Sequence, residues 1–247
     1  MRVPKAKRHL LFPFMGKILA VFFCAFVQES CTPNPGPTTP TSPSTSSSVT
    51  LPINPVAQQQ PEWCWLASGQ MVFQYYGIPP INPISYQCGI IAAFEGPNSV
   101  CWINCGACNF GAGSSLTIAP MLQQYSLIAT NGTKELSAVF APNMLPPQQI
   151  QTEIQAKRPV LAGINPGQTF AIFGNSEHLV VIVGYETSNG QFSLVVNDPF
   201  PYEAAGSPDP YLAVGATLLR PGQYLIAYDG FTQGLLWNTS WYNVAFM

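Results

Sequence analysis

Few residues of this chain could act as a nucleophile and a general base in covalent catalysis. Cys64 lies between two tryptophans in Gln-Pro-Glu-Trp-Cys-Trp, residues 60–65. Of the two histidines, His9 lies in the basic N-terminal segment, and His178 begins the apolar run His-Leu-Val-Val-Ile-Val-Gly-Tyr. A cysteine attacks as its thiolate and needs a base, usually a histidine. Cys64 and His178 are therefore the candidate nucleophile and general base.

A third polar group is needed to orient the imidazole and to stabilise its charged form. The next β-forming run, 191–197, follows a Ser-Asn-Gly turn and ends in Asn197-Asp198 before a proline. Two antiparallel strands joined by such a turn bring the end of the second strand beside the start of the first. Asp198 or Asn197 can therefore lie next to His178, and side-chain alternation allows only one of them to do so. The alternative is ordinary turn chemistry.

The segment 62–76 predicts a helix that carries Cys64. Pro61 precedes it and Gly77 follows it, as at the two ends of a helix. Apolar residues occur on all of its faces, which predicts a buried, central helix. Cys64 then lies in the first turn, where the helix dipole and free N–H groups favour the thiolate. The alternative is that Cys64 is a small buried packing residue, as most free cysteines are.

Seven cysteines make an odd count. Cys24 and Cys31 lie at the N-terminus. Four others lie close together in a Gly- and Asn-rich stretch: Cys88, Cys101, Cys105 and Cys108. In an exported protein these four predict two disulfides of open connectivity. A structural zinc site is the alternative, because Cys-Gly-Ala-Cys has the spacing of zinc ligands. Either arrangement leaves Cys64 unpaired.

Residues 1–31 have the layout of an export signal. They hold five of the nine basic residues, followed by the apolar run 18–27, which is too short to cross a membrane. Cys31 then begins a Pro-, Thr- and Ser-rich tract, 32–51, which predicts an extended tether. Two forms of the exported protein are possible: one carries a lipid on Cys31, as bacterial lipoproteins do, and the other is secreted without a lipid. The lipid would be the only attachment to a membrane. Both forms place the protein outside the cytoplasm.

Charge is scarce and mainly acidic after the N-terminus. Charged residues make up 8% of the chain, and residues 32–247 hold four basic against ten acidic ones. Such a chain lacks a basic surface for phosphates, which argues against a nucleic-acid partner. We expect no cofactor and no metal in the site, and the sequence does not specify an oligomeric state.

Taken together, these motifs resemble the papain-like cysteine peptidases. The resemblance is greatest to a bacterial branch that contains plant-pathogen effector proteases and their secreted relatives. The matching residues are Gln58, six residues before Cys64; the Cys-Trp pair; the strand that starts at His178; and the Asn-Asp-Pro turn. Four such motifs in this order are more specific than any one of them alone.

The resemblance implies an α+β fold of two lobes with an active-site cleft between them. The peptidase domain would span 52–247, with a helical lobe of about 52–130 and an antiparallel sheet lobe of about 131–247. Near the C-terminus, the β-forming runs 222–228 and 235–237 are expected to be further strands of that sheet.

The same resemblance implies a role for each site residue. Cys64 would be the nucleophile and His178 the base. The Gln58 side chain and the Cys64 backbone N–H would form the oxyanion hole. Asp198 would be the third member, because the bacterial branch has an Asp before Pro, with Asn197 in reserve because papain has an Asn. The substrate would be a protein or peptide.

Two other classes of function stay open. One is a related Cys-His acyl transfer on the same scaffold, such as leader-peptide processing, amide hydrolysis in cell-wall peptides or transglutamination. The other is a catalytically silent binding module on a surface stalk. The presence of Cys64, His178 and Asp198 together argues against the silent module, because binding alone does not need them.

Overall fold

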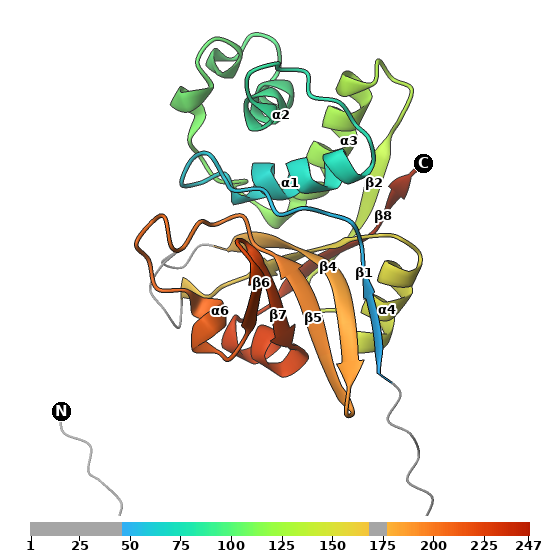
Figure 1. Cartoon of the computed structure of the whole chain (residues 1–247). Coiled ribbons are helices and arrows are strands. Elements are labelled where there is room, and N and C mark those ends of the chain that lie inside the picture. The colour runs from blue at the N-terminus through green and yellow to red at the C-terminus, as the bar shows by residue number, and fades with distance from the viewer. Residues whose placement is uncertain (1–45, 168–176) are drawn as a thin grey trace, which may run out of the picture. The chain divides into compact units, whose positions relative to one another are not determined.

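The structure is a computed structural model that describes residues 46–167 and 177–247. The expected export signal 1–31, most of the expected tether 32–51 and the lipid attachment at Cys31 lie outside the described residues. The chain forms a group of helices beside an antiparallel sheet (Figure 1). This arrangement confirms the α+β, papain-like two-lobe fold. Within the described residues, no helix is both long and apolar enough to cross a bilayer.

Three helices make up the helical lobe: α1 (Cys64–Tyr75), α2 (Tyr86–Glu95) and α3 (Ile118–Ala129). As predicted, α1 is central, and Trp65, Leu66 and Phe73 are almost fully buried. Burial of each such side chain contributes about 1.5–3 kcal/mol to folding. Gly69 allows α3 to approach closely, because a Cβ at this position would lie 2.9 Å from the methyl carbon of Met121.

The segment between α2 and α3 has little regular structure. It contains three short 3-10 turns: η1 (Val100–Trp102), η2 (Cys105–Cys108) and η3 (Ser115–Thr117). Two disulfides, Cys88–Cys105 and Cys101–Cys108, tie η2 to α2 and to η1. The predicted pair of disulfides is thus confirmed, and all four sulfurs are used, which leaves none for the zinc alternative. Disulfides are typical of an extracellular or exported protein.

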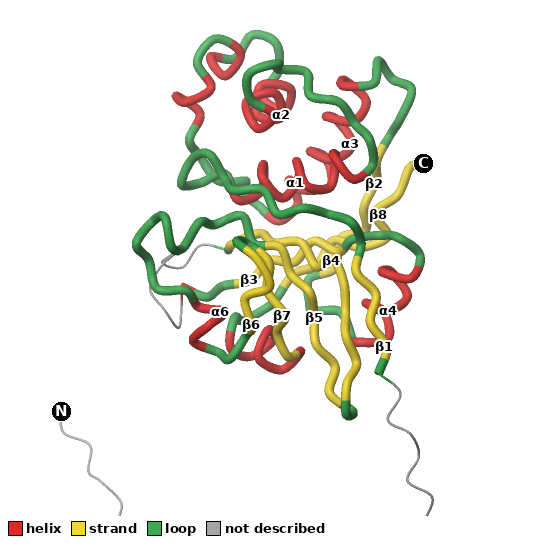
Figure 2. The backbone as a smooth tube through the Cα atoms, in the orientation of Figure 1, coloured by secondary structure: helices red, strands yellow, loops and turns green. Residues whose placement is uncertain are grey.

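Eight strands within the described residues form one sheet, in the order β2-β8-β3-β4-β5-β7-β6 with β1 paired to β4. Figure 2 shows most of these strands below the helical lobe, with β2 and β8 rising beside it. Their bounds are β1 (Ser47–Thr50), β2 (Leu136–Ala141), β3 (Val160–Ile164), β4 (His178–Ser188), β5 (Gln191–Asn197), β6 (Thr217–Arg220), β7 (Gln223–Ala227) and β8 (Thr239–Phe246). The remaining helical elements are α4 (Pro147–Gln155), α6 (Pro210–Ala213) and the π-helical turn η4 (Gly230–Gly234).

The strand β4 is the centre of the sheet. Its first half pairs with β3, and its second half pairs with β1 on the same side, while β5 runs along its other side. The hairpin between β4 and β5 is the one that the Ser-Asn-Gly turn predicts. Ser47–Thr50 were expected in the tether, but they form β1, so the sheet begins before residue 52. Their β-branched Val and Thr suit a paired strand.

One expected strand does not form. Residues 235–237 are irregular, and the chain enters β8 only at Thr239. Leu236 has a φ of 52°, in the left-handed region that no extended strand uses. Leu235 and Trp237 are buried all the same, so these apolar residues serve packing and not strand pairing.

Candidate active site

Cys64 is the first residue of α1 and is half-buried. Among the described residues it is the one cysteine outside a disulfide. The first N–H groups of a helix have no acceptor within that helix, and the N-terminal end carries a partial positive charge. Cys64 therefore lies in the first turn of the helix, beside these N–H groups, as the sequence predicts.

Both tryptophans that flank Cys64 bind the disulfide-linked segment. The indole N–H of Trp63 donates to the carbonyl of Cys108 over 2.9 Å, and that of Trp65 donates to the carbonyl of Phe110 over 3.3 Å. Each of these N–H groups is buried or partly buried, so breaking either bond would leave a donor shielded from water. The two bonds therefore fix the start of α1 against the segment. The Trp-Cys-Trp motif thus holds the thiol in place from both sides.

A buried hydrogen bond joins α1 to β4. The Ser68 hydroxyl donates to the carbonyl of Leu179 over 2.9 Å. Ser68 lies one helical turn after Cys64, on the same face of α1, and Leu179 directly follows His178. This bond fixes the start of α1 relative to the start of β4, which carry the thiol and the imidazole.

His178 and Asp198 form a buried pair. Each is about 2% exposed, and the His178 Nε2 lies 2.7 Å from the Asp198 Oδ1. The carboxylate also accepts the backbone N–H of Phe200 over 2.7 Å and the Tyr202 hydroxyl over 3.0 Å. Both carboxylate oxygens of Asp198 therefore accept hydrogen bonds, which fix the carboxylate and, through Nε2, the orientation of the imidazole. The other ring nitrogen, Nδ1, is then available to Cys64.

The electrostatics of the pair favour a charged imidazole. Burial disfavours the imidazolium, but the charge and hydrogen bond of Asp198 and the neighbouring Cys64 sulfur outweigh it and raise the pKa of His178 to about 10. The Cys64 thiol lies near enough to the ring to contribute to this rise in the pKa of His178. Burial, with the charge of Asp198 next, raises the pKa of Tyr202, which keeps its hydroxyl protonated as a donor.

Asn197 points away from this pair. Its side-chain nitrogen donates to the carbonyl of Ile53 over 3.0 Å, and its oxygen accepts the Gln223 amide over 2.7 Å. Consecutive side chains alternate between the two faces of a strand, so only one of the two neighbours can face His178. The structure places Asp198 there and gives Asn197 a buried structural position.

Gln58 lies in a loop anchored near Asp198. Its backbone N–H donates to the carbonyl of Pro199 over 2.9 Å. Its side-chain nitrogen donates to the carbonyls of Gln60 over 3.0 Å and Pro61 over 2.6 Å, and its buried side-chain oxygen has no hydrogen-bond partner. The amide N–H groups therefore face the loop itself.

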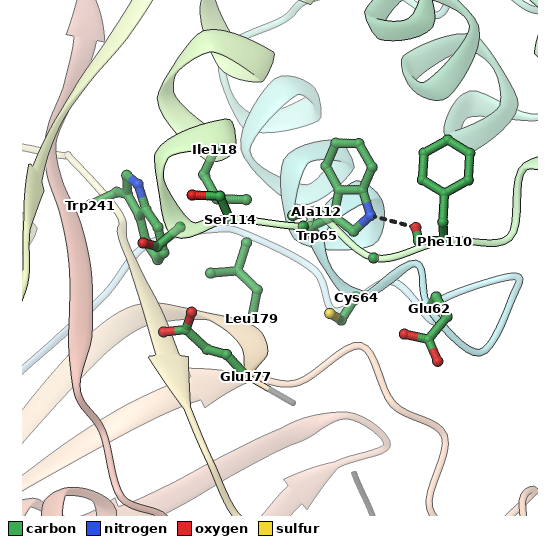
Figure 3. A pocket seen from close by; sticks show the side chains of 13 residues that line it. Glu62, Cys64, Trp65, Phe110, Ala112, Ser114, Ile118, Glu177, Leu179 and Trp241 are labelled. Atoms are coloured by element: carbon green, nitrogen blue, oxygen red, sulfur yellow. Dashed lines mark hydrogen bonds between the residues drawn. The ribbon is translucent and has the colours of Figure 1, made fainter. Parts of the chain in front are cut away.

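A cavity of about 490 Å³ opens at Cys64 (Figure 3). The helical lobe contributes Trp65 and Ile118 to its wall, and the sheet lobe contributes Leu179 and Trp241. The remaining wall includes Glu62, Glu177 and the run 110–115. The cavity thus lies between the two lobes, with the thiol on its surface.

Sequence reasoning missed part of this wall. Glu177 directly precedes His178, so its position beside the site could have been inferred. The run Gly-Ala-Gly-Ser-Ser at 111–115 offered a signal in its small residues, which leave room for a substrate backbone. Trp241 lies far along the chain and reaches the cavity only through the pairing of β8 with β3, which no local pattern reveals.

Comparison with known families agrees with this geometry. No curated protein matches the chain in sequence. The model of the Peptidase_C39 like family matches residues 50–216, more than half of the chain. The matched span holds Cys64, His178 and Asp198, and it indicates a cysteine peptidase whose substrate is a protein or peptide. This chain belongs to the Peptidase_C39 like family, within the cysteine peptidases.

Proposed function

We propose that this protein hydrolyses peptide bonds with a catalytic triad of Cys64, His178 and Asp198. One observation carries the proposal: a thiol at the start of a helix, open to a cavity, lies near enough to a buried imidazole to raise its pKa, and the Nε2 of that imidazole lies 2.7 Å from a buried carboxylate. Such an arrangement is that of a nucleophile, a base and an orienting group.

The reaction follows from these positions. The Cys64 proton resides on His178 Nδ1, and the thiolate attacks the carbonyl carbon of the scissile bond. The tetrahedral intermediate collapses as the imidazolium gives its proton to the leaving amine, which departs and leaves a thioester on Cys64. A water then attacks the thioester while His178 takes its proton, and collapse of the second intermediate releases the acid and restores the thiolate–imidazolium pair.

Two groups support the negative oxygen of each intermediate in this proposal. The backbone N–H of Cys64, in the first turn of α1, would be one donor. The Gln58 amide supplies the second donor, for which it must exchange one of its bonds to Gln60 or Pro61. Removal of one oxyanion donor commonly lowers kcat by about 10²–10³.

We also propose that the protein acts after export, with residues 1–31 as its signal and the tract from Cys31 as a tether. The two disulfides support an oxidising compartment. Lipid on Cys31 and free secretion remain the two forms of this proposal. The likeness to plant-pathogen effector proteases depends on the four sequence motifs alone, since the matched family is a different one.

Hydrolysis of a denatured protein substrate tests the proposed function. The protein is incubated with denatured casein, and new amino termini are measured for the wild type, Cys64→Ala and His178→Ala. We expect cleavage by the wild type only, with melting temperatures that show all three proteins to be folded. Cleavage that persists in Cys64→Ala would contradict the proposal. A Cys64 that reacts with iodoacetamide no faster in the folded than in the denatured protein would do so too, and would favour a binding module.

A further inference from the structure

We propose that Glu177 is a specificity-determining residue that binds a lysine or arginine side chain of the substrate. This inference rests on the proposed peptidase function and names the class of peptide that the site accepts. It follows from the charge of the cavity, from the contacts that hold Glu177 and from the apolar wall beside it.

The two residues with charged side chains that line the cavity, Glu62 and Glu177, are both acidic. Cys64 lies between Glu62 on one side and Glu177 with Trp241 on the other (Figure 3). No lysine or arginine is among the described residues that line the cavity. A cleft of one charge sign attracts groups of the opposite sign and rejects like charges. A peptide with basic side chains therefore suits this cleft, and an acidic peptide does not.

Glu177 is held in place at the cavity wall. Its side-chain carboxylate accepts the hydroxyl of Thr239 on β8. Thr239 pairs with Gly163 on β3, and a Cβ at Gly163 would overlap both the Glu177 carboxylate and the Thr239 hydroxyl. The carboxylate thus occupies space that exists because residue 163 is a glycine. The Glu177 residue is nevertheless solvent-exposed, so its charge is open to a ligand.

Trp241 supplies a second feature of a ligand site. It lies two residues after Thr239 on β8, so both side chains are on the same face of the strand. Trp241 is 1% exposed, and its buried indole N–H has no hydrogen-bond partner among the described residues. An unpaired buried donor is costly, so this part of the cavity wall holds a polar group that the described residues do not satisfy.

The same wall suits the rest of a basic side chain. Leu179 and Trp241 both line the cavity beside Glu177. Lysine and arginine pack their methylene stems along apolar surface while the charged end meets a carboxylate. Glu62, on the far side of Cys64, adds negative charge to the cavity.

Cleavage-site profiling tests the inference. A cell lysate digested with glutamyl endopeptidase gives peptides with internal lysine and arginine, and mass spectrometry records where the protein cuts them. We expect lysine and arginine to be enriched at one fixed position relative to the scissile bond. Glu177→Gln should reduce that enrichment by about fivefold or more, and Glu177→Lys should reverse it in favour of acidic residues. A purely structural role would not produce such a reversal.

Two further variants serve as comparisons. Thr239→Val removes the hydroxyl that holds Glu177 and should weaken the preference in part. Glu186→Gln makes the same charge change as Glu177→Gln but at the opposite end of β4, so it should leave the profile unchanged. A profile without basic enrichment, or one that Glu177→Gln and Glu186→Gln change equally, would overturn the inference.

The rate of Cys64 alkylation by iodoacetamide separates this inference from the proposed function. The reagent is small and neutral, so it does not report on a charge at Glu177. If Cys64 reacts rapidly and peptides are cut without preference for basic residues, only the inference fails. If Cys64 is no more reactive than in denatured protein, or if it is reactive and no peptide is cut, the peptidase function fails and the inference with it.

Discussion

The two lobes hold their shares of the candidate site by different means. On the helical side, the thiol of Cys64 is fixed by two indole hydrogen bonds to a segment of short turns that two disulfides tie together. On the sheet side, His178 and Asp198 are fixed by the ladder between β4 and β5 and by a buried polar network. One side depends on covalent links and the other on hydrogen bonds and charge.

This difference predicts different sensitivities. The turns between α2 and α3 are held by few regular backbone hydrogen bonds of their own. Loss of the disulfides should therefore affect the cavity wall and the position of the thiol. The strands need no covalent link, but the buried His178–Asp198 pair depends on the protonation of the imidazole. Redox conditions should therefore act on the helical side, and pH on the sheet side.

The largest expected effect separates Asp198 from its neighbour. Asp198→Ala removes the acceptor of His178 Nε2, and we expect kcat/KM to fall by about 10²–10⁴. Asn197→Ala removes buried bonds to Ile53 and Gln223, so it should lower stability while leaving kcat/KM of the folded protein within a few-fold. Steady-state kinetics and urea unfolding of both variants measure this. An equal loss of activity in the two would contradict the placement of Asp198 in the site.

The next effect concerns the disulfide Cys101–Cys108. The double change to serine should lower the free energy of unfolding by about 2–5 kcal/mol, as for other native disulfides. It should also slow alkylation of Cys64, because Trp63 donates to the Cys108 carbonyl. Urea unfolding and iodoacetamide kinetics provide the two readouts. Alkylation at the wild-type rate in the folded variant would show that the segment does not position the thiol.

A smaller effect is expected at Tyr202. Tyr202→Phe removes the hydroxyl that bonds the Asp198 Oδ2 and keeps the ring. A hydrogen bond to a charged group is worth about 1.5–3 kcal/mol, so activity should fall by roughly tenfold if orientation of the carboxylate matters to the reaction. Tyr242→Phe, on β8, is a matched control outside this network. Kinetics that are the same for both variants would show that the Tyr202 bond serves stability alone.

The last effect is a pH dependence of stability. The pKa of His178 is raised from 6.5 to about 10 in the fold. A raised pKa stabilises the fold fully below the unfolded value, and that contribution is lost as pH rises from 6.5 through 10. Urea unfolding at about pH 6, 8 and 10.5 should therefore show a steeper loss for the wild type than for His178→Gln. Parallel losses would contradict the charged state of the imidazole.

Much of the sheet side was predictable from the sequence. The turn between two β-forming runs specifies a hairpin, and a hairpin brings the residue after 197 beside residue 178. The pattern did not decide between Asn197 and Asp198, because the choice depends on the register of β4 with β5, which shifts between Ile182 and Gly184. Such an irregularity is a property of packing and not of a local motif.

The helical side was predictable in its parts but not in their connections. The helix at Cys64 and the pair of disulfides follow from the sequence, whereas the pairing of the four cysteines does not. The role of the tryptophans also escaped prediction, since an indole beside a cysteine is ordinarily a packing residue. Only the folded segment shows that carbonyls of Cys108 and Phe110 receive their N–H groups.

The most direct test of the central claim is the pH dependence of Cys64 alkylation. Iodoacetamide is reacted with the wild type and with His178→Ala across about pH 5 to 10, beside N-acetylcysteine as a free thiol. If Cys64 and His178 share a proton, the wild type reacts far faster than N-acetylcysteine near neutral pH, and His178→Ala loses that advantage. A wild-type curve that follows N-acetylcysteine, or a variant as reactive as the wild type at neutral pH, would contradict the account.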